Sequence, residues 1–352
     1  TQNSPHLAPA LFVDQLLQCL IDIEDPQNQD PEDPLAITTH LIAATTLQAL
    51  FCHNAQVIFE RVKVFFENYI RSTNWIEVHA AIYSIFALCK QSDELDGNYS
   101  PTVKEFLDEN FKLIIIHAGP DAMCLRTRET AMWIISSVIE SYPMIDQDSE
   151  EGVNKLIELF EKSMDPSHPI SIITRACKIF KIVASQCDRS YLDSIFQRIS
   201  ELILVTIQNI QPTINPDDAT KPLVALNALI RNCSNFCDQQ VSELLNELIR
   251  ILQNQECCIL LVSPICLAIC TILMKIKNII EPSIAESLLN PFIKLIDVTT
   301  QEPTSFQQNG AEFDLEIWES TFLVIANLID LGAVTNSGIV LIITNSIFNA
   351  LY

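Results

Sequence analysis

The sequence predicts an all-α protein built as a solenoid of stacked helix pairs, and three observations support this prediction. Apolar residues recur at helical spacing along almost the whole chain of 352 residues. Only 6 residues are Gly whereas 49% are hydrophobic, which argues against a β protein with many turns. The chain is also longer than one compact core usually holds, and a stack of repeats avoids this limit because each unit buries its apolar face on its neighbours.

The segment 151–164 illustrates the helical pattern. Val153, Leu156 and Phe160 recur on one side, whereas Lys155 falls on the other. Such a one-sided distribution predicts an amphipathic helix.

We predict seven helix pairs and one further helix. First helices are expected to begin near Leu7, Ala55, Pro101, Gly152, Tyr191, Asp238 and Pro282. Second helices are expected to begin near Leu35, Trp75, Asp121, Pro169, Thr220, Ile259 and Phe313, and the last helix near Asn336. The resulting units of about 40 to 55 residues are typical of HEAT or armadillo repeats. The sequence therefore predicts one HEAT-repeat superhelical solenoid over residues 1–352.

Local signals support several of these helix starts. Asn74 is placed to cap the helix that begins at Trp75, and Ser190 the helix near Tyr191. Pro101 fits the first turn of its helix. The turn 165–169 predicts a break between the two helices of one pair.

The charge balance bears on the kind of partner. With 44 acidic against 21 basic residues, the formal net charge is -23. Nucleic acid is a poor fit, since phosphate binding needs clustered Lys and Arg. An acidic surface attracts basic partners over long range, although acidity that only aids solubility is the alternative.

Cysteines and histidines give no sign of a metal or catalytic site. Most of the 12 Cys lie in helical apolar patterns, where a thiol acts as a small buried hydrophobe, and their spacing suits a reducing compartment. Zinc-type CxxC pairs, HExxH pairs and Gly-rich phosphate loops are not found in the sequence. We therefore expect no metal, no cofactor and no enzymatic activity.

The ends of the chain predict a segment of a longer solenoid. The chain starts without Met and stops within an apolar helix at residues 350–352. No signal peptide is visible, and the apolar run 339–343 is too short to span a bilayer.

The connection 22–34 is strongly acidic. Three prolines keep it extended. It is either a solvated turn or an anionic strap for a basic partner. Its acids are Asp22, Glu24, Asp25, Asp30, Glu32 and Asp33.

Trp133 is the next candidate for partner binding. The core stripe of its helix is expected at Ala131, Ile134, Ile135 and Val138. Trp133 would then lie with Glu129 and Glu140 on a more polar face, where an aromatic ring beside carboxylates suits a Lys or Arg guest. The alternative is that Trp133 packs in the core. Tyr83 takes a similar place one repeat earlier.

Several segments resemble importin-β, the HEAT-repeat nuclear transport receptor, in their order and spacing. They are the acidic connection 22–34, NWIEVHAA at 74–81 with SDE at 92–94, RETAMW at 128–133 and ALNALIRNC at 225–233. The resemblance covers most of residues 7–330.

This resemblance implies the middle of such a receptor, from about its eighth repeat onward. It implies that second helices line the concave face and that a basic cargo or importin-α-like adaptor binds there, to be released by Ran-GTP. By position, Trp133 resembles one tryptophan of the cargo-binding array. The resemblance further implies contact with FG nucleoporins, and residence in the cytoplasm, the nucleus and the nuclear pore.

The sequence departs from the family in two places that matter. Prolines and Gln interrupt the acidic connection, and Lys178 stands where the next tryptophan of the array is expected. With Arg175 and Lys181 nearby, that strip is expected to repel a basic helix. The sequence thus predicts a nuclear import receptor segment. The alternative is a HEAT scaffold subunit, of the phosphatase or coat-complex type, with no transport role.

Overall fold

The computed structural model describes residues 7–22, 39–89, 100–142, 150–209, 216–234, 238–253, 261–276, 285, 288–295 and 311–332. Over these residues the ordered elements are helices and no strand occurs, so the all-α class is confirmed. The chain divides into two compact units: unit 1 is Thr1–Cys187 and unit 2 is Asp188–Tyr352.

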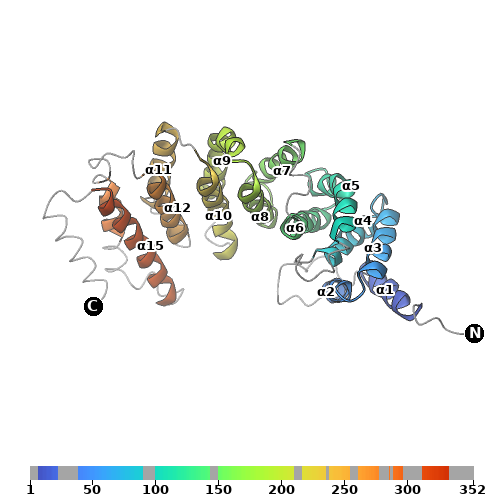
Figure 1. Cartoon of the computed structure of the whole chain (residues 1–352). Helices are drawn as coiled ribbons and strands as arrows, with labels where there is room; N and C mark the ends of the chain where they lie inside the picture. Colours follow the sequence, from blue (N-terminus) through green and yellow to red (C-terminus); the bar gives the residue numbers. More distant parts are fainter. Residues whose placement is uncertain are drawn as a thin grey trace, which may run out of the picture. The chain divides into compact units, whose positions relative to one another are not determined.

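Unit 1 consists of helix pairs arranged in two layers (Figure 1). Its first helices are α1 (Leu7–Cys19), α3 (Ala55–Tyr69), α5 (Ser100–Ala118) and α7 (Glu150–Ser163). Its second helices are α2 (Thr39–Phe51), α4 (Trp75–Ser84) with the 3-10 turn η1 (Ile85–Leu88), α6 (Leu125–Ser141) and α8 (Ile170–Gln186). Each second helix packs on its own first helix, and along the layer α2 packs on η1, α4 on α6, and α6 on α8.

Unit 2 repeats this arrangement. Its described first helices are α9 (Arg189–Gln208) and α11 (Asp238–Gln253), and these two pack against each other. Its second helices are α10 (Pro216–Asn232), α12 (Val262–Lys275) and α15 (Ala311–Asp330). The contacts run from α10 to α12 and from α12 to α15. Stacked helix pairs in both units confirm the predicted all-α solenoid.

Most predicted helix starts agree with the structure. Those at Leu7, Ala55, Trp75 and Asp238 are confirmed to the residue. Six others, for α5, α7, α8, α9, α12 and α15, fall within three residues of the observed starts. The starts expected near Leu35, Pro282 and Asn336 lie outside the described residues.

Two predicted starts were wrong by four residues. Helix α6 begins at Leu125 instead of Asp121, because the Cys124 side chain caps it by accepting a hydrogen bond from the Thr127 amide at 3.4 Å. Helix α10 begins at Pro216 instead of Thr220, which places that proline in the first turn, where its missing N–H costs little.

Side chains mark the helix boundaries as follows. Asn74 caps α4, as predicted, and accepts a hydrogen bond from the Ile76 amide at 3.1 Å. For α9 the predicted cap was wrong: Asp188 is the cap and accepts from the Ser190 amide at 2.7 Å, since Ser190 already lies inside the helix. Gly332 follows α15 with a φ of 84°, a left-handed conformation that glycine adopts without strain.

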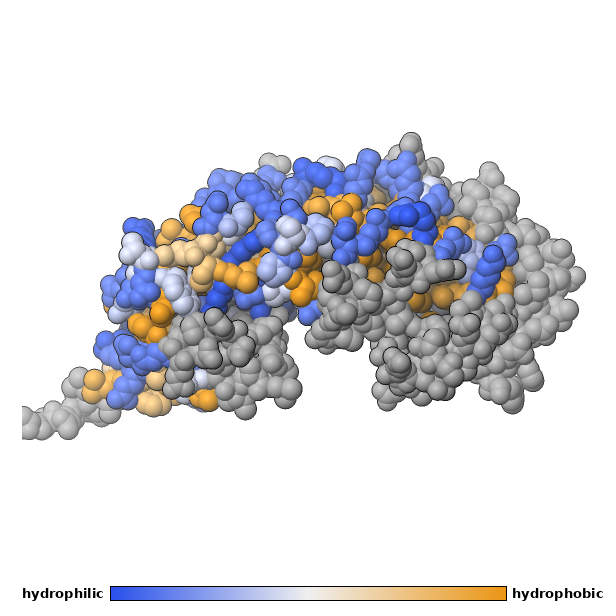
Figure 2. Space-filling view, turned by 180° about the vertical axis from the view of Figure 1, so that it is seen from behind, coloured by the Kyte–Doolittle hydropathy of each residue, from blue (hydrophilic) through white to orange (hydrophobic). Residues whose placement is uncertain are grey.

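The apolar stripes face inward as the periodicity predicted. Val153, Leu156 and Phe160 of α7 are buried, whereas Lys155 and Glu151 form an exposed ion pair at 2.6 Å. Hydrophilic residues cover much of the visible surface of the described helices, and hydrophobic residues show in smaller areas between them (Figure 2).

The described cysteines behave largely as core residues. Five are buried, namely Cys89, Cys177, Cys233, Cys266 and Cys270. Burial raises the pKa of the Cys89 thiol well above its usual range and raises the pKa of both Cys233 and Cys270 to about 12. These thiols therefore stay protonated and unreactive while they remain covered.

Within the described part of the chain, no helix has the length and apolar character needed to cross a membrane.

Candidate functional site

The second helices of unit 1 bring together a set of aromatic rings that includes two predicted site residues. Trp75, His79 and Tyr83 are spaced four residues apart and form one stripe along α4. The ring of His79 lies 6.4 Å from that of Trp75 and 5.7 Å from that of Tyr83, measured between centroids. The stripe therefore forms a continuous row of rings.

Two neighbouring helices extend this row into a cluster. From α2, His40 approaches His79 edge-on at 6.3 Å. From α6, Trp133 lies 5.2 Å from Tyr83 and stacks on Phe86 of η1 at 4.6 Å. We call these six residues, including Trp75, the aromatic cluster. It joins α2, α4, η1 and α6 through ring contacts.

Trp133 is therefore a packed residue, and the expectation of an open ring on a polar face was wrong. Its side chain is 6% exposed because Phe86 and Tyr83 cover its faces. The hydroxyls of Ser136 and Ser137 donate to the Trp133 carbonyl instead of facing a guest. The expected core stripe Ala131, Ile134, Ile135 and Val138 is fully buried, as predicted. The partner-binding role of Trp133 and of Tyr83, which is 3% exposed, stays a prediction.

The predicted carboxylates are placed differently from one another. Glu129 is half-buried and accepts a short hydrogen bond from Ser171 of α8, so it links two second helices. Glu140 is exposed near the end of α6. Asp22 is exposed just beyond α1, and the other five acids of the connection, Glu24, Asp25, Asp30, Glu32 and Asp33, lie outside the described residues.

Cations surround the aromatic cluster on the side of α6 and α8. Burial, together with the positive charge of Arg126, lowers the pKa of His79 to about 3, so the ring is neutral at pH 7. Burial raises the pKa of Tyr83 to about 12, although Arg126 and Arg175 act in the opposite direction. Arg175 is buried, and Lys178 is half-buried one turn later.

Sequence reasoning missed His40, His79 and Phe86 as members of the cluster. The four-residue spacing of Trp75, His79 and Tyr83 was a usable signal, because it places three rings on one helical face. His40 and Phe86 gave no comparable signal, since their approach depends on how α2 and η1 pack.

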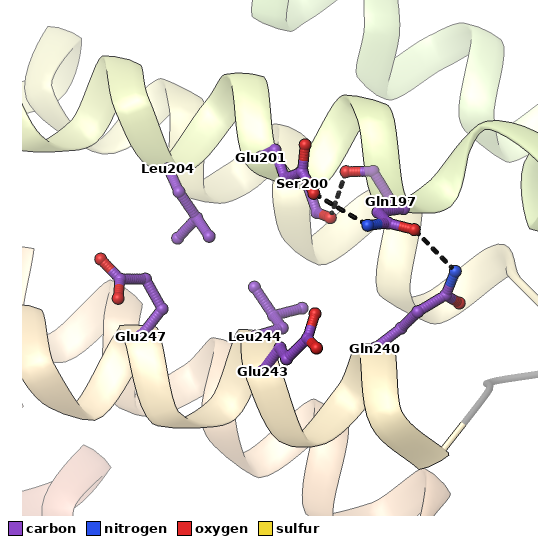
Figure 3. Close-up of a pocket in the computed structure, with 8 residues that line it drawn as sticks. All are labelled: Gln197, Ser200, Glu201, Leu204, Gln240, Glu243, Leu244 and Glu247. Carbon is purple, nitrogen blue, oxygen red and sulfur yellow. Dashed lines mark hydrogen bonds between the residues drawn. The ribbon is translucent and has the colours of Figure 1, made fainter.

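Unit 2 carries a hollow of about 220 Å³ between its first helices α9 and α11 (Figure 3). Leu204 and Leu244 point into it from opposite helices. The carboxylates that line it are Glu201, Glu243 and Glu247. The remaining lining residues are Gln197, Ser200 and Gln240.

Hydrogen bonds hold several of these side chains in place. Gln197 donates to Glu201 at 3.0 Å and accepts from Gln240 at 3.3 Å, which links the two helices. Arg250 donates to Glu247 at 2.9 Å and holds the pKa of that carboxyl below its usual range. Arg250 neutralises Glu247, whereas Glu201 and Glu243 add negative charge to the lining.

Among the described residues, no group of three or more His, Cys, Asp or Glu side chains is arranged to hold a metal ion.

Comparison with known proteins finds solved structures that share this fold. No protein-family model and no curated protein matches the sequence. Among solved structures, yeast importin-β (Kap95p) matches with a TM-score of 0.68 at 16% identity, over 93% of this chain and 36% of that one. The Kap95:Nup1 complex gives a TM-score of 0.67 at 15% identity, over 93% and 36%. Kap121p bound to RanGTP gives 0.63 at 12% identity, over 91% and 29%.

These matches confirm the resemblance at the level of the fold. The matched regions cover about nine-tenths of this chain. The chain spans about a third of the length of those receptors.

Proposed function

We propose that this chain is a segment of a nuclear import receptor that binds a basic cargo or an importin-α-like adaptor. The observation that carries the proposal is the fold match to importin-β over 93% of the chain. The order of the motifs at 74–81, 128–133 and 225–233 supports the same assignment from sequence.

The matched receptors support particular partners. Kap121p has been solved with RanGTP, and Kap95 with Nup1. By analogy we propose that Ran-GTP releases the cargo and that a nucleoporin contacts the array. Shuttling between cytoplasm and nucleus through the pore would follow from those contacts.

We assign the basic partner to the acidic surfaces instead of the aromatic cluster. The net charge of -23 would steer a basic segment toward the chain. Suitable contacts are Glu140 and the acidic connection 22–34. Tyr83 and Trp133 are almost fully buried, so we propose that these rings and Glu129 support the binding layer from within.

A binding series with salt tests this proposal. A Lys/Arg-rich peptide is titrated into the chain at rising NaCl concentrations, and the affinity is expected to fall steadily because exposed charge pairs are screened. The triple change Asp30→Asn, Glu32→Gln, Asp33→Asn should weaken binding. The matched control Glu105→Gln, Asp108→Asn, Glu109→Gln on α5 removes the same charge and should leave binding close to that of the unchanged chain.

If both triple variants lose the same affinity for the peptide, net charge alone explains the binding, and a specific site is contradicted. Addition of Ran-GTP is expected to lower the amount of bound peptide. Absence of peptide binding at low salt together with no Ran-GTP response would favour the scaffold alternative.

A further inference from the structure

We propose that the hollow between α9 and α11 binds one arginine side chain of a partner protein. The hollow lies on the first-helix layer of unit 2. The basic partner proposed above contacts the acidic connection 22–34 and Glu140, which belong to unit 1. This inference does not rest on the transport role, because it follows from the shape and the charge of the hollow alone.

Two side-chain hydrogen bonds connect the helices toward the two ends of the hollow. Gln240 donates to Gln197 at 3.3 Å, and these are the first lining residues on their helices. Gln208 donates to Glu247, the last lining residue on α11, at 2.5 Å. Gln240 and Glu247 are about 10 Å apart along α11, given the rise of about 1.5 Å per residue. The hollow is therefore a short slot that both helices hold open without a guest.

Aliphatic side chains form the base of the slot. Leu204 is 8% exposed and Leu244 is 4% exposed, and the two point toward each other from opposite helices (Figure 3). The volume of about 220 Å³ exceeds the roughly 150 Å³ that holds a benzene molecule, so one long side chain fits. The methylene stem of an arginine can lie against the two leucines, because long cationic side chains readily cover apolar surface.

Carboxylates form the rim of the slot. Glu201 and Glu243 are exposed, and each comes about one turn after the bridging glutamine of its own helix. The two carboxylates therefore line the slot at about the same level from opposite sides. Arg250 balances the charge of Glu247 only. The rim thus carries negative charge where the head group of a cationic guest would end.

The chemistry of the rim favours arginine over other guests. A guanidinium is planar and has five donors, so one arginine can bond to carboxylates of both helices. A lysine ammonium is more strongly hydrated, which makes its approach to the leucines less favourable. A phenylalanine ring suits the leucines but gains nothing from the carboxylates. We therefore expect the order of affinity to be arginine, then lysine, then phenylalanine.

The test uses four peptides that differ at one central position between glycine and serine flanks. This position holds arginine, lysine, phenylalanine or citrulline, the uncharged analogue of arginine with nearly the same shape. Each peptide is titrated into the intact chain, and the NMR signals of the Leu204 and Leu244 methyl groups are followed. The arginine peptide should shift both signals and bind at least about fivefold more tightly than the citrulline peptide, because hydrogen bonds between charged groups are the stronger ones.

A substitution in the rim provides the matching change on the protein. Glu243→Gln should weaken binding of the arginine peptide at least about fivefold, because one of the two rim charges is lost. It should leave the weak binding of the citrulline peptide unchanged. The control Glu319→Gln removes the same charge from an exposed position of α15 in the same unit, and should leave the arginine peptide bound as in the unchanged chain.

Several outcomes would overturn the inference. They are an absence of shifts at Leu204 and Leu244, equal affinity for the arginine and citrulline peptides, and binding of the lysine or phenylalanine peptide as tight as that of the arginine peptide. Equal weakening by Glu243→Gln and Glu319→Gln would assign the effect to net charge and also overturn it. The transport test depends on Ran-GTP and on the connection 22–34, so either proposal can fail while the other holds.

Discussion

The second helices of unit 1 and those of unit 2 meet their neighbours through side chains of very different size. In unit 1 the rings of Tyr83, Phe86 and Trp133 fill the space between α4, η1 and α6. In unit 2 the short side chains of Asn227 and Thr271 meet between α10 and α12 instead. Large apolar side chains are exposed on second helices of both units, for example Ile42 of α2 and Leu267 of α12. One repeat architecture thus joins its second helices through large rings in one unit and through short polar side chains in the other.

The largest expected effect on stability concerns the packed rings of unit 1, compared with an exposed apolar residue of unit 2. Trp133→Ala should destabilise unit 1 by about 3 to 5 kcal/mol, because it removes a buried ring from a packed cluster. Leu267→Ala, at an exposed position in unit 2, should change stability by less than about 0.5 kcal/mol. Hydrogen exchange of each unit measures both effects. Similar losses in the two variants would contradict the difference between the layers.

The second prediction concerns acid. Burial lowers the pKa of His79 to about 3 from 6.5, so the unfolded chain takes up this proton first as the pH falls. The stability linked to His79 is complete above pH 6.5 and is lost between about pH 6.5 and 3, at up to about 1.4 kcal/mol per pH unit. In His79→Leu, denaturant unfolding of unit 1 should depend less on pH across this range.

The control for acid is His53→Leu, which replaces an exposed histidine of the same unit. Its pH dependence should match that of the unchanged chain. If both variants respond alike, the His79 ring is not the source of the acid sensitivity.

A smaller effect is expected from the hydrogen bond that joins the second helices of unit 2. Thr271→Val keeps the shape but removes the hydroxyl, which lies 3.3 Å from the Asn227 amide oxygen and 2.8 Å from the Leu267 carbonyl, and should cost about 1 kcal/mol. Thr45→Val on α2 removes an exposed hydroxyl that bonds only within its own helix, and should cost less. Chemical denaturation of both variants measures the difference. A loss as large as that of Trp133→Ala would contradict the role given to ring packing.

The smallest effect is expected on the first helices of unit 2. Arg250→Gln removes an exposed ion pair with Glu247, and stability should change by less than about 0.5 kcal/mol. The pKa of Glu247 should rise toward its ordinary value, because the Arg250 hydrogen bonds that lower it are lost. Carboxyl carbon NMR titration records this rise. An unchanged pKa would show that the hydrogen bonds between Arg250 and Glu247 do not persist in solution.

Sequence reasoning predicted the helices well because their causes are local. The cap at Asn74 and the apolar spacing of 151–164 depend on residues within a few positions. The start of α6 was missed because a cysteine, an uncommon cap, takes that role at Cys124.

The candidate surfaces were harder to predict because they depend on neighbouring helices. The polar spacing around Trp133 suggested an open ring, but Phe86 from another repeat covers it. Likewise, nothing near Leu267 in the sequence tells which helices flank it. Such surfaces follow from the packing of the layer, and local periodicity does not record that packing.

The buried thiols make the opening of each unit detectable by chemical modification. Cys89 lies in unit 1 and Cys233 and Cys270 lie in unit 2, and all three are inert while covered. Alkylating reagents would therefore modify them only when their own unit opens. The order in which these cysteines are alkylated, followed by mass spectrometry, would show which unit opens first without any change to the sequence.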